Sequence, residues 1–226
     1  MTRRLCKLVL LAFVLAVSAA THAAAAEQYV ALGDSYSSGT GTRSYYDSSC
    51  QRSNYSYAKI IGAERPNTSV NLVACSGAKT GDVLANQVSA LSSTTRWASI
   101  TIGGNDAGFS DVITACALPS WASNCNGKVD TAQSYINNTL PGKLSSVYST
   151  IKSKAPNATV IVLSYPRLFM GEDCNAGTFF SSSEMTRLNQ TADLLRALDQ
   201  GRGGRVRPGA QSRHPGGFPA SLLRAP

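Results

Sequence analysis

Four short apolar runs, separated by longer stretches with helical features, constrain the fold of this chain more than any other feature. The runs are rich in Val, Ile and Ala and cover Tyr29–Leu32, Val70–Ala74, Ala98–Ile102 and Thr159–Leu163. Continuous apolar runs of this length are typical of strands that a parallel sheet buries on both faces. The helical stretches cover Tyr55–Ile61, Asp82–Leu91, Lys128–Lys154 and Ser182–Leu198. This alternation predicts an α/β fold with a parallel sheet between helices on both faces.

The start of the last helical stretch has a capping signature. Ser181 and Glu184 stand three positions apart, which is the spacing of a capping box. In that arrangement the two side chains satisfy backbone N–H groups that the first turn of a helix leaves without partners. We therefore expect a helix to begin at Ser182.

The first 26 residues have the order of an export signal. Three basic residues precede the apolar run Leu8–Ala20, and Ala24–Ala26 supplies the small residues that a signal peptidase needs. The run is shorter than the roughly 20 residues that a membrane span requires. We therefore expect cleavage before Glu27 and a secreted, extracellular protein.

The composition changes beyond Ala197. About half of the last thirty residues are Arg, Gly or Pro, and no acidic residue follows Asp199. Such a composition is typical of disorder, so we expect one domain over residues 27–200 and a disordered tail over 201–226. A GC-rich coding sequence read in a shifted frame would give the same mixture. In that alternative the native end of the fold, including the last strand of the sheet, would be missing.

The cysteines bear on the same alternative. Export leads to an oxidising environment in which cysteines pair. The expected mature chain has an odd number of them: Cys50, Cys75, Cys116, Cys125 and Cys174. An odd number means either a free thiol or a missing partner.

The net charge of +8 is concentrated at the two ends of the chain. The segment from Glu27 to Arg196 carries 13 basic and 12 acidic residues, so the expected domain is close to neutral. A nucleic-acid partner would require a basic stripe, which this balance does not favour. The sequence also lacks HExxH, CxxC and phosphate-loop motifs, so we expect no metal, no nucleotide and no other cofactor.

Glycine and polar residues directly follow three of the apolar runs. The three segments are Gly33–Gly39, Cys75–Ala78 and Gly103–Asp106. Each alone would fit an ordinary turn or a helix cap. Together, at the carboxyl ends of successive parallel strands, they predict one catalytic edge of the sheet. Ser35 can act there as a nucleophile, while the backbone N–H of Gly77 and the amide of Asn105 can stabilise an oxyanion.

At these residues the chain resembles the GDSL/SGNH hydrolase family, in particular its secreted bacterial lipases and phospholipases A1. The matching segments are YVALGDSYSSG at 29–39, ACSGA at 74–78 and ITIGGNDAGF at 100–109. The resemblance implies a three-layer α/β/α fold with Ser35 as the nucleophile. It also implies that Ser35, Gly77 and Asn105 form the oxyanion hole.

The family's fourth motif places a histidine after a final strand, usually as D-x-x-H. His214 is the only histidine of the expected mature chain, and His214–Pro215 matches the motif, which makes His214 the candidate general base. Gln211 stands in place of the aspartate. Because the surrounding tail lacks strand and helix formers, we expect that His214 is not held reliably beside Ser35.

The family pattern further implies the disulfides Cys50–Cys75 and Cys116–Cys125, and it leaves Cys174 free in this chain. The resulting prediction is a monomeric serine ester hydrolase that cleaves esters of lipids or phospholipids, at a lipid–water interface or in solution. Two alternatives remain open. One is a catalytically impaired product that at most binds lipid, and the other is a carbohydrate acetylesterase on the same fold.

Overall fold

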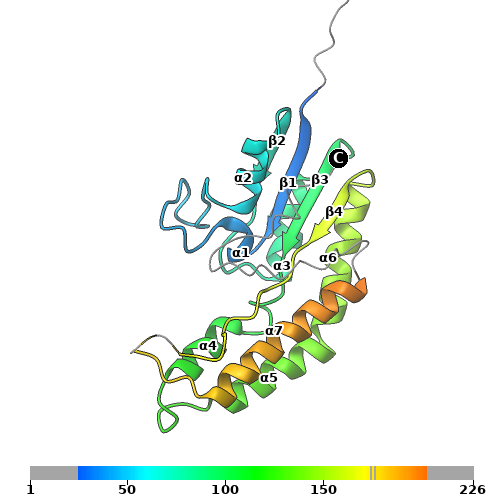
Figure 1. Ribbon diagram of the computed structural model, residues 1–226. Helices are drawn as coiled ribbons and strands as arrows, with labels where there is room; N and C mark the ends of the chain where they lie inside the picture. Colours follow the sequence, from blue (N-terminus) through cyan, green and yellow to red (C-terminus); the bar gives the residue numbers. More distant parts are fainter. Residues whose placement is uncertain (1–24, 174, 176, 203–226) are drawn as a thin grey trace, which may run out of the picture.

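The computed structural model describes residues 25–173, 175 and 177–202 of the 226-residue chain. Its centre is a four-stranded sheet in the order β2-β1-β3-β4, in which all neighbouring strands are parallel. The strands are β1 (Glu27–Gly33), β2 (Thr68–Leu72), β3 (Thr95–Thr101) and β4 (Thr159–Val162). All four predicted strands are therefore present, each shifted by a few residues at most. Their carboxyl ends point toward the lower half of Figure 1.

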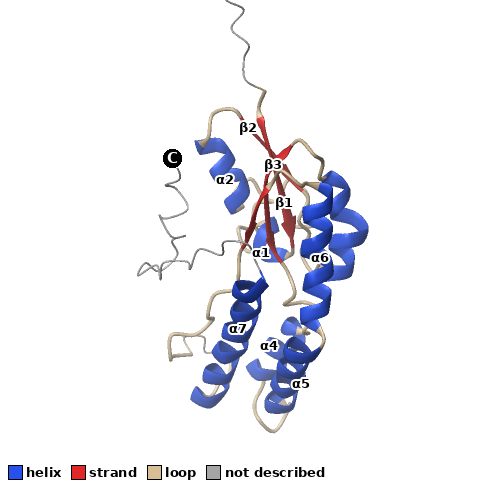
Figure 2. Cartoon of the chain, turned by 90° about the vertical axis from the view of Figure 1, so that its right-hand side faces the viewer, coloured by secondary structure: helices blue, strands red, loops and turns tan. Residues whose placement is uncertain are grey.

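Helices cover both faces of the sheet, as the alternation of strands and helices predicted. Helix α2 (Tyr57–Glu64) lies on one face and α6 (Leu140–Lys154) on the other (Figure 2). In β1, Tyr29 and Ala31 pack in a small core with α2. Val30 and Leu32 belong to a larger core that includes a single stripe of α6: Leu140, Leu144, Val147 and Ile151. This period of two is the expected alternation of a strand that is buried on both sides.

A helical layer extends below the carboxyl ends of the strands (Figure 1). It contains α4 (Phe109–Ala117), α5 (Cys125–Asn138) and α7 (Ser182–Arg202). These helices share a third core, whose buried residues are Val112, Cys116, Cys125, Val129, Ala132 and Leu188. The predicted capping box is present: the Glu184 carboxylate accepts the N–H of Ser181 at 2.8 Å, and the Ser181 hydroxyl accepts the N–H of Glu184 at 3.3 Å.

The predicted helix Lys128–Lys154 is wrong in its continuity, because the structure has two helices there. Helix α5 ends at Asn138, and α6 starts at Leu140 with Pro141 in its first turn. Proline has no N–H to donate and its ring clashes with the preceding turn, so it is tolerated at a helix start but not in a helix interior.

The predicted helix Asp82–Leu91 is likewise not a single α-helix. It begins earlier as α3 (Thr80–Asp82), widens into the π-helical turn η1 (Val83–Gln87) and closes as the 3₁₀ turn η2 (Val88–Ala90). The π-helical turn ends at Gln87, whose buried side chain bonds to the β1 backbone. A tertiary contact of this kind accompanies the departure from regular helical geometry. Two helices were not predicted, α4 and the short α1 (Ser35–Ser38).

Both disulfides implied by the resemblance are present, Cys50–Cys75 and Cys116–Cys125. Helix α7 continues to Arg202. Residues 1–24 of the expected signal segment, Cys174, and the tail beyond Arg202 with His214 lie outside the described residues. Within the ranges that the structure describes, no helix has both the length and the apolar character that crossing a membrane requires.

Candidate functional site

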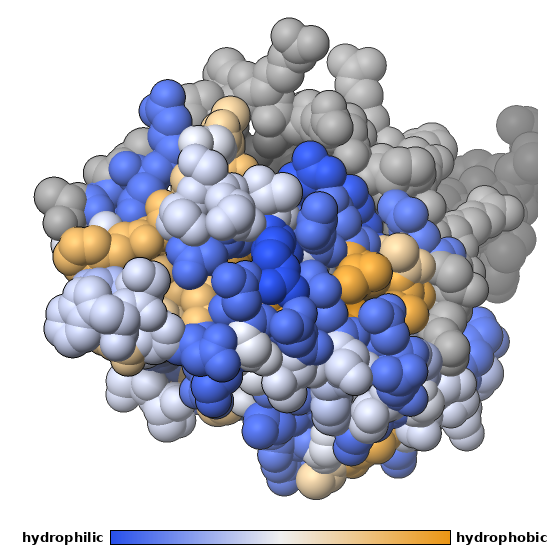
Figure 3. Space-filling view, turned by 90° about the horizontal axis from the view of Figure 1, so that it is seen from below, coloured by the Kyte–Doolittle hydropathy of each residue, from blue (hydrophilic) through white to orange (hydrophobic). Residues whose placement is uncertain are grey.

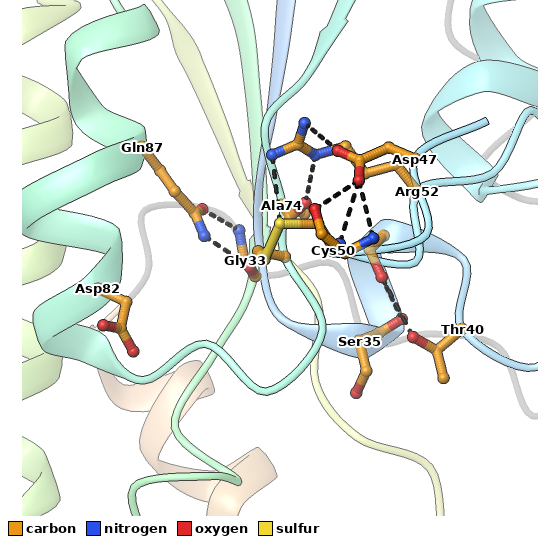
Figure 4. Close-up of a disulfide and its surroundings, with 12 residues drawn as sticks. Gly33, Ser35, Thr40, Asp47, Cys50, Arg52, Ala74, Asp82 and Gln87 are labelled. Carbon is orange, nitrogen blue, oxygen red and sulfur yellow. Dashed lines mark hydrogen bonds and ion pairs between the residues drawn. A yellow bond between two sulfur atoms is a disulfide. The ribbon is translucent and has the colours of Figure 1, made fainter. Parts of the chain in front are cut away.

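Ser35 lies at the carboxyl end of β1, where the chain turns from strand to helix. Asp34 caps α1, and its buried carboxylate accepts the N–H of Tyr36 at 3.0 Å. Gly33 has a φ of +121°, and a Cβ at this position would lie 2.4 Å from the carbonyl oxygen of Thr101. Only glycine therefore allows β1 to approach β3 so closely at the turn. Ser35 itself is half-buried, and its side chain points away from the strands (Figure 4).

The side chain of Gln87 fixes the backbone at this turn. Its Oε1 accepts the N–H of Gly33 at 2.7 Å, and its Nε2 donates to the carbonyl oxygen of Gly33 at 2.9 Å (Figure 4). The same carbonyl also accepts the N–H of Cys75 at 3.0 Å, whereas no second acceptor for the N–H is present in the described part of the chain. Gln87 is thus a residue of the site that the sequence motifs did not reveal.

We expect Gln87→Leu to lower the free energy of unfolding by about 1–3 kcal/mol, because it leaves the buried N–H of Gly33 without a partner. Urea denaturation of the purified variant measures this. Gln133→Leu is the matched control, since Gln133 makes one hydrogen bond, to the Thr191 hydroxyl at 2.9 Å, in a half-buried position. An equal stability of the two variants would contradict the role of Gln87.

Gly77 lies in the loop that follows β2. Its φ is +82° and no atom lies within 4 Å of where its Cβ would be, so the backbone conformation rather than space favours glycine here. Backbone hydrogen bonds hold the residues on both sides of Gly77. The N–H of Ser76 donates to the carbonyl oxygen of Cys50 at 2.9 Å, and the N–H of Ala78 donates to the carbonyl oxygen of Cys75 at 3.1 Å. The disulfide Cys50–Cys75 fastens the same loop (Figure 4).

Asn105 lies in the loop that follows β3, and this loop bonds to the one that carries Gly77. The amide of Asn105 donates to the carbonyl oxygen of Ala78 at 3.0 Å. Next to it, the Asp106 carboxylate accepts the N–H of Thr80 at 2.9 Å and the Thr80 hydroxyl at 2.5 Å. The loops after β1, β2 and β3 are therefore joined at one edge of the sheet.

Several hydrogen-bond donors at this edge have no acceptor. Neither the N–H of Ser35 nor that of Gly77 has a partner among the described residues. A side-chain amide has two N–H donors. One of those of Asn105 donates to the carbonyl oxygen of Ala78, which leaves the other for a ligand. The edge of the sheet that carries the Ser35 hydroxyl thus also carries fixed donors, and such donors can stabilise negative charge on an oxygen atom.

The Asp34 carboxyl group is the most perturbed acid at this edge. Burial raises its pKa to about 6, although hydrogen bonds from Tyr165 and from the N–H of Tyr36 lower it. Tyr165 follows β4 and donates its hydroxyl to Asp34. The sequence motifs did not point to Tyr165, but its place directly after a fourth apolar run was a signal that could have.

The described residues contain no group of three or more His, Cys, Asp or Glu side chains that could hold a metal ion. His214, the candidate general base, lies outside them. The structure therefore places Ser35, Gly77 and Asn105 at one edge and gives no position for His214.

Comparison with known proteins adds independent information. Residues 31–208 match the GDSL-like Lipase/Acylhydrolase family. The chain is 47% identical over 186 residues to Lipase 1 of Streptomyces coelicolor, covering 81% of this chain and 68% of that protein. It is 48% identical over 176 residues to a lipase of Streptomyces rimosus, covering 76% and 65%. The chain thus spans about two thirds of the length of these relatives.

Two solved structures resemble the fold at similar identity. The extracellular lipase of Streptomyces rimosus has a TM-score of 0.73 and 46% identity, covering 78% of this chain and 76% of that one. Phospholipase A1 of Streptomyces albidoflavus has a TM-score of 0.73 and 48% identity, covering 79% and 75%.

Proposed function

Because this chain belongs to the GDSL-like lipase/acylhydrolase family, whose members hydrolyse carboxylic esters, we propose that it cleaves esters of lipids through an acyl-enzyme on Ser35. The observation that carries the proposal is the junction of three strand-end loops. Hydrogen bonds join the end of β1 to the loop of Gly77 and that loop to Asn105, within a chain 47% identical to a Streptomyces lipase, and this supports the proposal. The extracellular location and monomeric state expected from the sequence belong to this proposal.

The proposed reaction has two steps. The Ser35 oxygen attacks the ester carbonyl carbon and loses its proton to a histidine base, and the proton then passes to the departing alcohol. Water hydrolyses the acyl-enzyme in the second step and releases the carboxylic acid. In both steps the carbonyl oxygen becomes negative, and the N–H groups of Ser35 and Gly77 and the amide of Asn105 donate to it. His214 remains the predicted base.

Hydrolysis of a short nitrophenyl ester by the purified chain tests the proposal, together with labelling by a fluorophosphonate, which reacts with activated serines. We expect turnover, and a label that peptide mass spectrometry locates on Ser35. A chain that neither hydrolyses the ester nor takes up the label would contradict the proposal.

Exposed apolar side chains support a lipid substrate presented at a lipid–water interface. The N–H of Phe179 donates to the carbonyl oxygen of Ala117 at 3.1 Å, and the rings of Phe169 and Phe180 lie 4.8 Å apart. The bond between Phe179 and Ala117 joins the segment that follows β4 to the end of α4. The exposed apolar residues of this segment and of the loop after α4 are Leu118, Trp121, Met170 and Phe179. From below, apolar areas lie among polar side chains (Figure 3). Such residues can insert into the surface of a lipid aggregate.

We expect the double variant Trp121→Ser/Phe179→Ser to lose about 30-fold in activity on an emulsified long-chain ester, because each side chain contributes about 1 kcal/mol when partly inserted. Its activity on the soluble nitrophenyl ester should stay within twofold of the original. Tyr55→Ser is the control, since Tyr55 is 62% exposed and precedes α2. An equal loss on both substrates would show that the two side chains act on folding or chemistry instead.

A further inference from the structure

One buried hydroxyl connects the loop of Ser35 to the loop of Asn105. The Tyr165 side chain is 7% exposed, and its hydroxyl donates to the carboxylate of Asp34. The same oxygen accepts the N–H of Gly104 at 2.9 Å. Asp34 immediately precedes Ser35, and Gly104 immediately precedes Asn105. Tyr165, which lies in the segment that follows β4, thus bonds to the residue before Ser35 and to the residue before Asn105.

We propose that Tyr165 is a positioning residue, which fixes the nucleophile Ser35 relative to the oxyanion donor Asn105 through hydrogen bonds to Asp34 and Gly104. This inference rests on the proposed esterase function. It extends that function from three strand ends to the fourth, since β4 contributes a side chain that holds the other loops in register.

The Tyr165 ring packs closely against Gly104 and Tyr36. A Cβ at Gly104 would lie 2.9 Å from Cζ and 3.0 Å from the hydroxyl oxygen of Tyr165, so a side chain at 104 would displace the ring. On its other side, the ring meets that of Tyr36 edge-on, with centroids 5.1 Å apart. Gly104 therefore allows Tyr165 to approach, and Tyr36 holds it against α1.

The protonation states suit this link. Burial and the nearby charge of Asp34 raise the pKa of the Tyr165 hydroxyl well above its usual value, so the hydroxyl keeps its proton at neutral pH. The pKa of Asp34 is about 6, so its carboxyl group is mostly ionised at neutral pH. It accepts a charge-assisted hydrogen bond from the Tyr165 hydroxyl. A protonated hydroxyl that donates to Asp34 does not act as a general base. The role of Tyr165 is therefore to position the two loops.

The test compares Tyr165→Phe with Tyr29→Phe in the full chain. Tyr29 is a matched control because it is also buried, and its hydroxyl bonds to the Ser99 hydroxyl at 2.8 Å, in the core with α2. We expect Tyr165→Phe to lower the rate of fluorophosphonate labelling of Ser35 by about 10- to 100-fold, as small misplacements at catalytic sites do. On the nitrophenyl ester, kcat should fall by a similar factor while KM stays within twofold. Tyr29→Phe should stay within twofold in both measurements.

Asp34→Asn weakens the same link from the other side, because it removes the charge of the acceptor, and it keeps every buried ring. Asparagine also caps helices well, so this variant tests the link even where Tyr165→Phe folds poorly. We expect it to label at least about fivefold more slowly than the unmodified chain, since a neutral amide replaces the charged acceptor of the Tyr165 hydroxyl. A folded variant of either kind that labels Ser35 at the original rate would overturn the inference.

Amide hydrogen exchange separates this inference from the proposed function, because it does not depend on catalysis. The Gly104 amide should exchange at least about tenfold faster in Tyr165→Phe than in Tyr29→Phe, since its acceptor is gone. Equal exchange in the two variants would overturn the inference. If the unmodified chain shows neither labelling nor hydrolysis, the proposed function fails, and the exchange comparison still decides whether Tyr165 holds the loop.

Discussion

With a histidine base in place beside Ser35, Ser35→Ala is expected to lower kcat on a nitrophenyl ester by about 10⁶-fold, as removal of a serine nucleophile does in other hydrolases. The acyl-enzyme cannot form without the hydroxyl, and the remaining donors can only assist attack by water. Stability should change by less than about 0.5 kcal/mol, because Ser35 is half-buried and its side chain makes no hydrogen bond among the described residues. Steady-state kinetics and thermal denaturation measure the two quantities.

Ser44→Ala serves as the control for this variant. Ser44 is exposed in the loop that follows α1, and among the described residues its only hydrogen bond is the one that its backbone carbonyl accepts from the Thr42 hydroxyl. Its kcat should equal that of the unmodified chain. If Ser35→Ala keeps activity within tenfold of Ser44→Ala, the nucleophile lies elsewhere and the proposed mechanism is wrong.

Asn105→Ala is expected to lower kcat by about 10²–10³-fold with KM little changed, the loss seen when one oxyanion donor is removed. The effect falls on kcat because the donor acts on a charge that develops only in the transition state. The variant also loses the hydrogen bond to Ala78, which should lower the free energy of unfolding by about 1 kcal/mol.

Asn138→Ala separates these two effects. Its side-chain amide also donates to a backbone carbonyl, that of Ser134 at 2.9 Å, but at the end of α5. Asn138→Ala should lower the free energy of unfolding slightly, as Asn105→Ala does, but its kcat should equal that of the unmodified chain. A rise in KM with unchanged kcat in Asn105→Ala would instead indicate that the residue binds substrate in its ground state.

Much of the architecture could be predicted because it depends on local patterns. The four apolar runs form the four strands, and α7 begins at Ser182, as the capping box of Ser181 and Glu184 predicted. The amphipathic helix α4 was missed although Phe109, Val112, Ile113 and Cys116 have helical spacing. The helix has only nine residues, and the glycine-rich segment before it, Gly103–Gly108, has the composition of a loop.

The sequence by itself determined which residues end each strand, and so it pointed to Ser35, Gly77 and Asn105. Those residues are recognisable because their chemistry depends on residue type and on a position after a strand. The tertiary structure alone decided what holds them: Gln87 at Gly33, and Tyr165 between Asp34 and Gly104. Tyr165 is separated from Asp34 by 131 positions in the chain. Contacts over such separations follow from how the strands are ordered in the sheet, and no local pattern encodes that order.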